Sequence, residues 1–302
     1  MVKDKLASSE IEKVSSFIPL DKSWIIRMGI LDFINGYSDI FKLLENERYL
    51  GGDLEVLPKV IRDFSKKSSL IDVGESGTIY RFVSFYIWKN KIPAEIKLSK
   101  TLVERVARGA ITNNPEIVNF SAEQLLELDN QTSQWATMAY LLGDRKKVKN
   151  PPYKLQVTYD AVESWENARK NKKSWEARID PTIFNQALAF VEFLKTEKIN
   201  FKPEQAEDYC FARAFNILTQ DQAKILYPSL EGHETPRFEE MEKSIKEAES
   251  GKVSSKDHRV VQAIAMKYFP KFTKENFVTP DCVNKTWPRF WDFIEYCKRE
   301  YV

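Results

Sequence analysis

The sequence predicts an α/β protein, because its hydrophobic pattern switches between strand-like and helix-like segments. Residues 69–73 form a short apolar run that leads through Gly74 into a helical pattern over residues 77–88. This succession of strand, turn and helix is typical of an α/β unit. It returns at residues 153–157 and 161–168. The chain has 302 residues, which allows one large or two medium domains.

The other elements follow from the same patterns in chain order. Ser23 has the side chain of a helix N-cap, Gly36 ends that helix, and Pro181 and Pro203 suit the first turns of two later helices. Further helices are expected at residues 23–34, 54–64, 102–108, 134–142, 181–194, 203–218, 234–249, 260–268 and 287–296. Further strands are expected at residues 92–98, 116–120 and 175–179.

The composition is that of an ordinary globular protein, with 43% hydrophobic and 30% charged residues. Because 46 basic residues face 44 acidic ones, no global field attracts nucleic acid or a membrane surface. The N-terminus lacks the apolar segment of a signal peptide, and no run approaches the roughly 18 apolar residues of a membrane span. We therefore expect a cytoplasmic protein whose anion sites, if present, are local.

The residues that bind metals and nucleotides in other proteins are scarce. The chain has three widely spaced cysteines, Cys210, Cys282 and Cys297, and two histidines, His233 and His258, which argues against a zinc site. Neither a Walker-type nor a dinucleotide-type glycine-rich loop is present. We expect neither a metal nor a cofactor.

Positive side chains stand where several helices are expected to begin. Lys22, Arg259 and Lys285 each precede or open an apolar helical run, and Arg81 follows the helix start at Gly77 by one turn. A helix N-terminus already carries partial positive charge and unpaired N–H groups, so cations there are unfavourable unless an anion joins them. The repeated arrangement predicts binding of anionic ligands.

Several short motifs, taken together, resemble the 5-enolpyruvylshikimate-3-phosphate synthase family. They occur in the family's order and span nearly the whole chain. They are IPLDKSWIIR at residues 18–27, GDL at 52–54, SGTIYR at 76–81, TSQ at 132–134, Tyr153, Asp208, ETPR at 234–237, DHR at 257–259 and DCVNKTWP at 281–288.

The resemblance implies a two-domain α/β fold of enolpyruvyl transferases, built of βαβαββ-like units, some of them trimmed. The chain would cross between domains near Leu20 and Ile179, so that residues 21–179 form the first domain, and residues 1–20 with 180–302 form the second. The active site would lie in the cleft between them. The implied activity is that of a 3-phosphoshikimate 1-carboxyvinyltransferase of aromatic amino acid biosynthesis. This enzyme transfers the enolpyruvyl group of phosphoenolpyruvate to shikimate 3-phosphate and releases phosphate, as a monomer without a cofactor.

The resemblance also implies roles for single residues. The catalytic residues would be Lys22, Asp208 and Glu234. Shikimate 3-phosphate would be bound by Lys22, Ser23, Arg27, Thr132, Ser133, Gln134, Tyr153, Asp208 and His233. Phosphoenolpyruvate would be bound by Lys22, Gly77, Lys100, Arg105, Gln134, Arg237, His258, Arg259 and Lys285.

Each of these residues also has a purely structural interpretation. Asp208 and Glu234 fit as exposed acids on helices, and residues 132–134 are a good helix cap. Arg81 and Arg105 fit as members of surface ion pairs, with Glu75 and Glu104 as partners.

The chain also departs from the family pattern. It is shorter than the family norm, Glu75 replaces a small or amide residue, and His233 and Pro236 replace a lysine and an aspartate. These departures motivate two alternatives: a transferase that uses another anionic acceptor, or a catalytically silent ligand-binding protein. A related family acts on a nucleotide sugar through a loop cysteine. None of the chain's cysteines lies near Gly77 or Arg105, so that reading ranks low.

Overall fold

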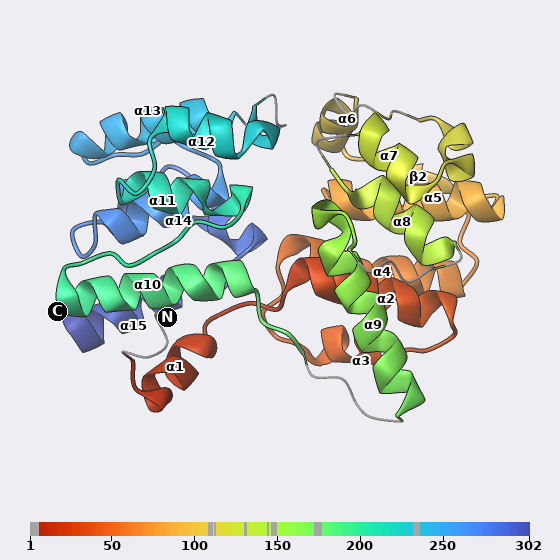
Figure 1. Ribbon diagram of the computed structural model, residues 1–302, viewed down its shortest axis with the longest axis horizontal. Helices are drawn as coiled ribbons and strands as arrows, with labels where there is room; N and C mark the ends of the chain where they lie inside the picture. The colour runs from red at the N-terminus through yellow and green to blue at the C-terminus, as the bar shows by residue number, and fades with distance from the viewer. Residues whose placement is uncertain are drawn as a thin grey trace. The chain divides into compact units, whose positions relative to one another are not determined.

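The predicted α/β class is wrong, because the protein is mainly helical. The computed structural model describes residues 6–107, 111, 113–129, 132–143, 145, 150–171, 177–231 and 236–302. It is 66% helix and 4% strand, and helices dominate the ribbon in Figure 1. Since the described part of the chain holds a single two-stranded sheet, it contains no βαβαββ unit, and the enolpyruvyl transferase fold expected from the motifs is not what the chain adopts.

The chain forms two compact units. We call Asp21–Arg178 the central unit, and Met1–Leu20 together with Ile179–Val302 the terminal unit. In the terminal unit, Leu20 and Ile179 form an isolated antiparallel bridge. In the central unit, the Asp21 N–H donates to the Arg178 carbonyl at 2.7 Å, and the Arg178 Nε lies 3.0 Å from the Asp21 carboxylate. The two ends of the central unit are therefore tied to each other.

The central unit contains eight α-helices and the short sheet among its described residues. The helices are α2 (Lys22–Ile34), α3 (Asp39–Asn46), α4 (Gly52–Ser65), α5 (Gly77–Asn90), α6 (Lys100–Val106), α7 (Ala122–Leu128), α8 (Gln134–Leu142) and α9 (Gln156–Lys170). Two 3₁₀ helices, η1 (Pro115–Asn119) and η2 (Tyr153–Leu155), complete it. Strands β1 (Leu70–Asp72) and β2 (Glu95–Lys97) pair in parallel, with Ile71 opposite Ile96.

Two predicted strands are short helices instead. The Asn114 side chain accepts the Glu116 N–H, and Pro115 occupies the first turn, so residues 116–120 form most of η1. Residues 153–157 form η2 and the start of α9. A strand needs a neighbouring strand to satisfy its backbone groups, and neither segment has one. Of the predicted strand 175–179, residues 175 and 176 lie outside the described residues.

Helix α2 is the centre of the central unit and is buried on all sides from Trp24 to Asp32. Asp21, rather than the expected Ser23, caps it by accepting the Trp24 N–H. A Cβ on Gly29 would lie 2.9 Å from the Leu57 side chain, so the absence of a side chain lets α2 and α4 approach closely. Helices α3, α4 and α9 surround α2 (Figure 1).

Among its described residues, the regular elements of the terminal unit are all helices and no strands, apart from two isolated β-bridges. Its α-helices are α1 (Ser8–Ser15), α10 (Pro181–Thr196), α11 (Tyr209–Ala214), α12 (Gln220–Leu226), α13 (Arg237–Glu249), α14 (His258–Lys267) and α15 (Phe290–Tyr301). Its 3₁₀ helices are η3 (Ala206–Asp208), η4 (Pro228–Leu230), η5 (Lys274–Asn276) and η6 (Pro280–Lys285).

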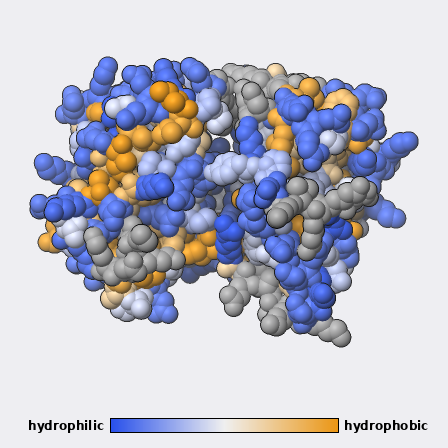
Figure 2. Space-filling view, in the orientation of Figure 1, coloured by the Kyte–Doolittle hydropathy of each residue, from blue (hydrophilic) through white to orange (hydrophobic). Residues whose placement is uncertain are grey.

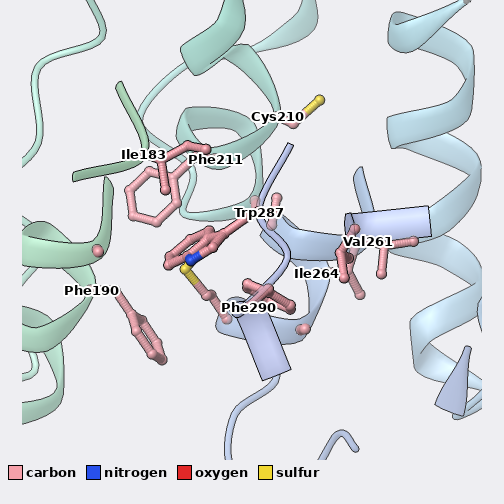
Figure 3. Close-up of a cluster of buried hydrophobic side chains, with 14 of the residues drawn as sticks. Ile183, Phe190, Cys210, Phe211, Val261, Ile264, Trp287 and Phe290 are labelled. Atoms are coloured by element: carbon pink, nitrogen blue, oxygen red, sulfur yellow. The ribbon is translucent and has the colours of Figure 1, made fainter. Parts of the chain in front are cut away.

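The core of the terminal unit is built around Trp287, which is fully buried. Figure 3 shows its indole among Phe190, Phe211 and Phe290, which come from three different helices. The Trp287 Nε1 donates to the Phe17 carbonyl at 2.8 Å. This bond satisfies the one polar atom of the indole, so the side chain is buried without an unpaired donor.

The surface in Figure 2 is mainly hydrophilic, in contrast to the apolar core. On the face in Figure 2, most side chains are hydrophilic and the apolar ones form smaller patches. Among the described residues, no helix combines the length and the apolar character that crossing a bilayer requires.

Candidate anion-binding sites

The first cluster of cations lies at the start of α5 in the central unit. Ser76 caps this helix by accepting the Ile79 N–H at 3.0 Å. A Cβ on Gly77 would lie 3.3 Å from an Nη atom of Arg81 and 3.4 Å from one of Arg105. The bare glycine therefore lets two guanidinium groups come up to a helix N-terminus, where the backbone is already partly positive.

A glutamine holds one of these arginines in place. The Arg81 Nη1 donates to the Gln134 Oε1 at 2.8 Å, and the Gln134 Nε2 donates to the Thr78 hydroxyl at 3.0 Å. The Gln134 N–H is itself bonded to the Thr132 hydroxyl at 3.0 Å. Thus Gly77, Arg105, Thr132 and Gln134, four of the predicted ligand residues, share one neighbourhood. Arg81 was not predicted as a ligand, although its position one turn after Gly77 carried the signal.

Glu75 brings a negative charge to the edge of this cluster. Its carboxylate accepts a hydrogen bond from the Thr101 hydroxyl, and its carbonyl accepts one from the Arg105 Nη1 at 3.0 Å. Lys100 is exposed at the first position of α6. Arg105 therefore bonds to Glu75, one of the acids expected as surface partners of Arg81 and Arg105, through the Glu75 backbone carbonyl.

The start of α2 holds Lys22 and Arg27 in different environments. The Lys22 Nζ lies 3.0 Å from the Asp53 carboxylate. The Arg27 side chain is only 6% exposed and donates to Thr158 at 2.8 Å, to Thr137 at 3.2 Å and to the Ser23 carbonyl at 2.6 Å. Burial lowers the pKa of Arg27 to about 10, and the nearby Asp21 carboxylate opposes this shift. Arg27 is therefore an interior cation that bonds to neutral groups.

Tyr153 and Ser133, two further residues predicted to bind shikimate 3-phosphate, stand at helix starts in the central unit. Tyr153 is 76% exposed in η2. Ser133 precedes α8 and makes no side-chain cap bond there. Ser133 directly precedes Gln134 of the Gly77 cluster, whereas Tyr153 begins a different helix.

The second cluster lies at the start of α14 in the terminal unit. Asp257 caps this helix by accepting the N–H groups of Arg259 and Val260. The Arg237 Nε donates to the same carboxylate at 3.1 Å. Burial alone would raise the pKa of the Asp257 carboxyl, yet Arg237 and the Arg259 N–H hold that pKa below its ordinary value. Asp257 is therefore an ionised anchor that positions Arg237 beside the helix start.

Three cations act electrostatically on His258, the first residue of α14. His258 is 7% exposed. Its pKa lies well below the ordinary value, first because of burial and then because Arg259, Lys285 and Arg237 lie near; Asp257 opposes the shift. The imidazole is therefore neutral near pH 7. Asp257 ties Arg237 to the start of α14, where His258 and Arg259 are the first two residues, and Lys285 acts on His258 electrostatically.

Asp208 adds a buried carboxyl group to this neighbourhood. It is 4% exposed, so the interpretation of Asp208 as an exposed surface acid is wrong. One oxygen accepts from Gln186 at 2.9 Å, and the other accepts the N–H groups of Glu204 at 3.0 Å and Gln205 at 3.2 Å. Burial raises the pKa of Asp208, against these bonds and the nearby Arg259. Nothing in the sequence indicated that Gln186 would bond to Asp208.

The predicted residues His233 and Glu234 lie outside the described residues. Within the ranges that the structure describes, no three potential ligands among His, Cys, Asp and Glu side chains gather where a metal ion would fit.

Comparisons of the chain with models of protein families, with curated proteins and with solved structures found no match. The two clusters of cations are therefore the features from which a function is inferred.

Proposed function

We propose that this protein binds small anions that carry phosphate and carboxylate groups, with phosphoenolpyruvate as the first ligand to test. The observation that carries the proposal lies at the start of α14, where Arg259 is the second residue of the helix and Asp257 holds Arg237 at 3.1 Å. Asp257 offsets the charge of Arg237, so Arg259 and the helix N-terminus supply the positive potential there, and Lys285 adds to it near His258. A bound anion would gain charge-assisted hydrogen bonds from these groups.

The arrangement around Arg259 supports a ligand contact. Among the described residues, its guanidinium makes one long hydrogen bond, 3.4 Å from the Nη1 atom to the Glu207 carbonyl. Within the described part of the chain, no carboxylate lies within ion-pair distance of it. A planar guanidinium with donors to spare suits the bidentate recognition of carboxylate or phosphate.

The cluster in the central unit supports a second anion of the same class. Arg81 and Arg105 flank a bare helix start at Gly77, and Gln134 fixes the direction of Arg81. Shikimate 3-phosphate, which the motifs imply, is the ligand we propose to test there. The proposal also includes a monomeric protein in the cytoplasm.

The test is calorimetric titration of the folded protein with phosphoenolpyruvate and, separately, with shikimate 3-phosphate. We expect Arg259→Gln to weaken phosphoenolpyruvate binding about tenfold to a hundredfold, the loss of one or two charge-assisted bonds. Arg299→Gln, on the exposed side of α15, is the matched control and should bind as the wild type does. If neither ligand binds the wild-type protein, or if both variants bind equally well, the proposal is wrong.

A second candidate function is the enolpyruvyl transfer itself, and the buried Asp208 favours it. A carboxyl group with a raised pKa beside cations suits a general base. In this reaction the acceptor hydroxyl oxygen bonds to the central carbon of phosphoenolpyruvate and gives its proton to Asp208. The methylene carbon gains a proton, and the tetrahedral intermediate then expels phosphate and loses a proton from the methyl group. Glu234 and Lys22 are the residues that the resemblance assigns to the proton that enters and then leaves the methyl carbon.

Phosphate release in the presence of both substrates tests this second candidate. We expect Asp208→Asn to abolish release while phosphoenolpyruvate still binds. A wild-type protein that binds both ligands but releases no phosphate would leave the binding function in place and exclude the transferase.

A further inference from the structure

An open hollow of about 620 Å³ lies in the central unit, away from both clusters of cations. It is bordered by α5, α8 and α9 and by the segment around Phe120. The size falls within the roughly 300–1,000 Å³ of small-molecule sites. Its lining combines apolar side chains with the charged Lys89, Glu123 and Arg145.

The apolar wall is aromatic. Phe85, Phe120, Tyr140 and Tyr159 all line the hollow. The rings of Tyr140 and Tyr159 stack with their centroids 4.3 Å apart, and Phe120 is partly exposed. Aromatic faces offer large, rigid contact area, and a planar ring gains stacking energy on them beyond the burial of apolar surface.

One arginine on the lining has an unsatisfied donor. The Nη1 of Arg145 is buried and makes no hydrogen bond to any described residue. Arg145 also adopts a positive φ of 42°, which non-glycine residues rarely accept and which tends to occur at functional sites. A buried, unbonded guanidinium nitrogen is costly, so a ligand oxygen at this position would remove an existing penalty.

The remaining charges on the lining restrict the ligand. The Lys89 ammonium donates one of its three N–H groups to the Val118 carbonyl at 3.0 Å, whereas the buried Arg145 Nη1 has no hydrogen-bond partner among the described residues. Glu123 also lines the hollow. Its negative charge disfavours a ligand with two or more negative charges, such as a phosphate ester, and tolerates a single carboxylate.

We propose that this hollow binds a planar aromatic monocarboxylate, with its ring against the aromatic wall and its carboxylate on Arg145. This site is separate from the two clusters of cations, and the proposal does not depend on the proposed function.

The test uses 2-naphthoate as the probe, titrated calorimetrically into the full-length protein. Two analogues separate the contributions: 2-naphthylmethanol keeps the ring without the charge, and cyclohexanecarboxylate keeps the charge without the aromatic ring. We expect 2-naphthoate to bind at least about tenfold more tightly than either analogue, as expected when both stacking and a charge-assisted bond are needed.

Two variants assign the site. Arg145→Gln should weaken 2-naphthoate binding about tenfold and leave 2-naphthylmethanol unaffected, and Tyr159→Leu should weaken both ring-bearing ligands. Arg48→Gln, an exposed arginine elsewhere in the same unit, is the matched control. An unchanged thermal midpoint shows that each variant is folded. No binding of 2-naphthoate up to about 5 mM, equal binding of cyclohexanecarboxylate, or wild-type affinity in Arg145→Gln would each overturn the proposal.

Discussion

The neutral, buried His258 makes the stability of the protein depend on pH in a predictable window. Its unfolded-state pKa is close to the ordinary 6.5, and its folded-state pKa is well below that value. The unfolded chain therefore takes up a proton below about pH 6.5 that the folded protein does not. This contribution to stability is complete above that pH and is lost as the pH falls toward the folded-state pKa.

The expected magnitude follows from the linkage of protons to folding. One proton taken up only on unfolding lowers the free energy of unfolding by about 1.4 kcal/mol per pH unit, so up to about 2 kcal/mol is lost between pH 7 and pH 5. Asp257 acts in the same direction but only below its ordinary pKa of 3.8. Asp208, with a raised pKa, acts in the opposite direction above 3.8. Arg237, Arg259 and Lys285 are the other charged groups that act on His258.

The assay is urea unfolding of the wild type and of His258→Gln at about pH 7, 6 and 5, followed by circular dichroism. The glutamine variant should lose about 2 kcal/mol less over this range, because the contributions of Asp208 and Asp257 are common to both proteins. Equal losses in the wild type and His258→Gln would refute the argument that His258 is held neutral.

Three further predictions address the interior and the first cluster. Thr158→Val removes the acceptor of the Arg27 Nε and should cost about 1–3 kcal/mol in urea unfolding; Thr158→Ser keeps the hydroxyl, so an equal cost in both variants would contradict the role of this bond. Trp287→Ala empties the centre of the terminal-unit core and should cost about 3–5 kcal/mol, measured in the same way, with Trp287→Phe costing less; a loss below about 1 kcal/mol would be inconsistent with the packing. Glu75→Gln removes a negative charge beside Arg105 and should tighten binding of inorganic phosphate about threefold to tenfold in calorimetry, whereas unchanged affinity would show that Glu75 does not act on the site.

The helices were largely predictable because their signals are local. The cap at Ser76, the Asp180–Pro181 start of α10 and the apolar spacing after Asp257 each act within one or two turns of the chain. The predicted helices at 23–34 and 77–88 accordingly agree with α2 and α5 within a few residues.

The strands were not predictable in this way. The apolar runs at 116–120 and 153–157 have the composition of strands. Among the described residues, however, the paired strands are residues 70–72 and 95–97. A strand is stable only when a second strand satisfies its backbone groups and covers one of its faces. A short apolar run without such a partner satisfies its backbone as a turn of helix instead.

The candidate sites likewise have features that the sequence indicated and contacts that it did not. The sequence indicated that cations open several helices, and the described structure has them there at Lys22, Arg259 and Arg81 with Gly77. The sequence held no sign that Gln186 would bond to Asp208, or that Thr158, 131 positions away, would bond to Arg27. Those contacts depend on which helices lie side by side.

The sequence by itself determined where helices begin, which side chains stand at those starts and which chemistry their charges permit, because capping and helical periodicity are interactions between near neighbours in the chain. Only the tertiary structure decided that the protein is helical and not α/β, which cations meet, and which acids and imidazoles are removed from water. Strand pairing and desolvation both require segments that are remote in sequence, so the ionisation of His258 and Asp208 follows from the packing around them.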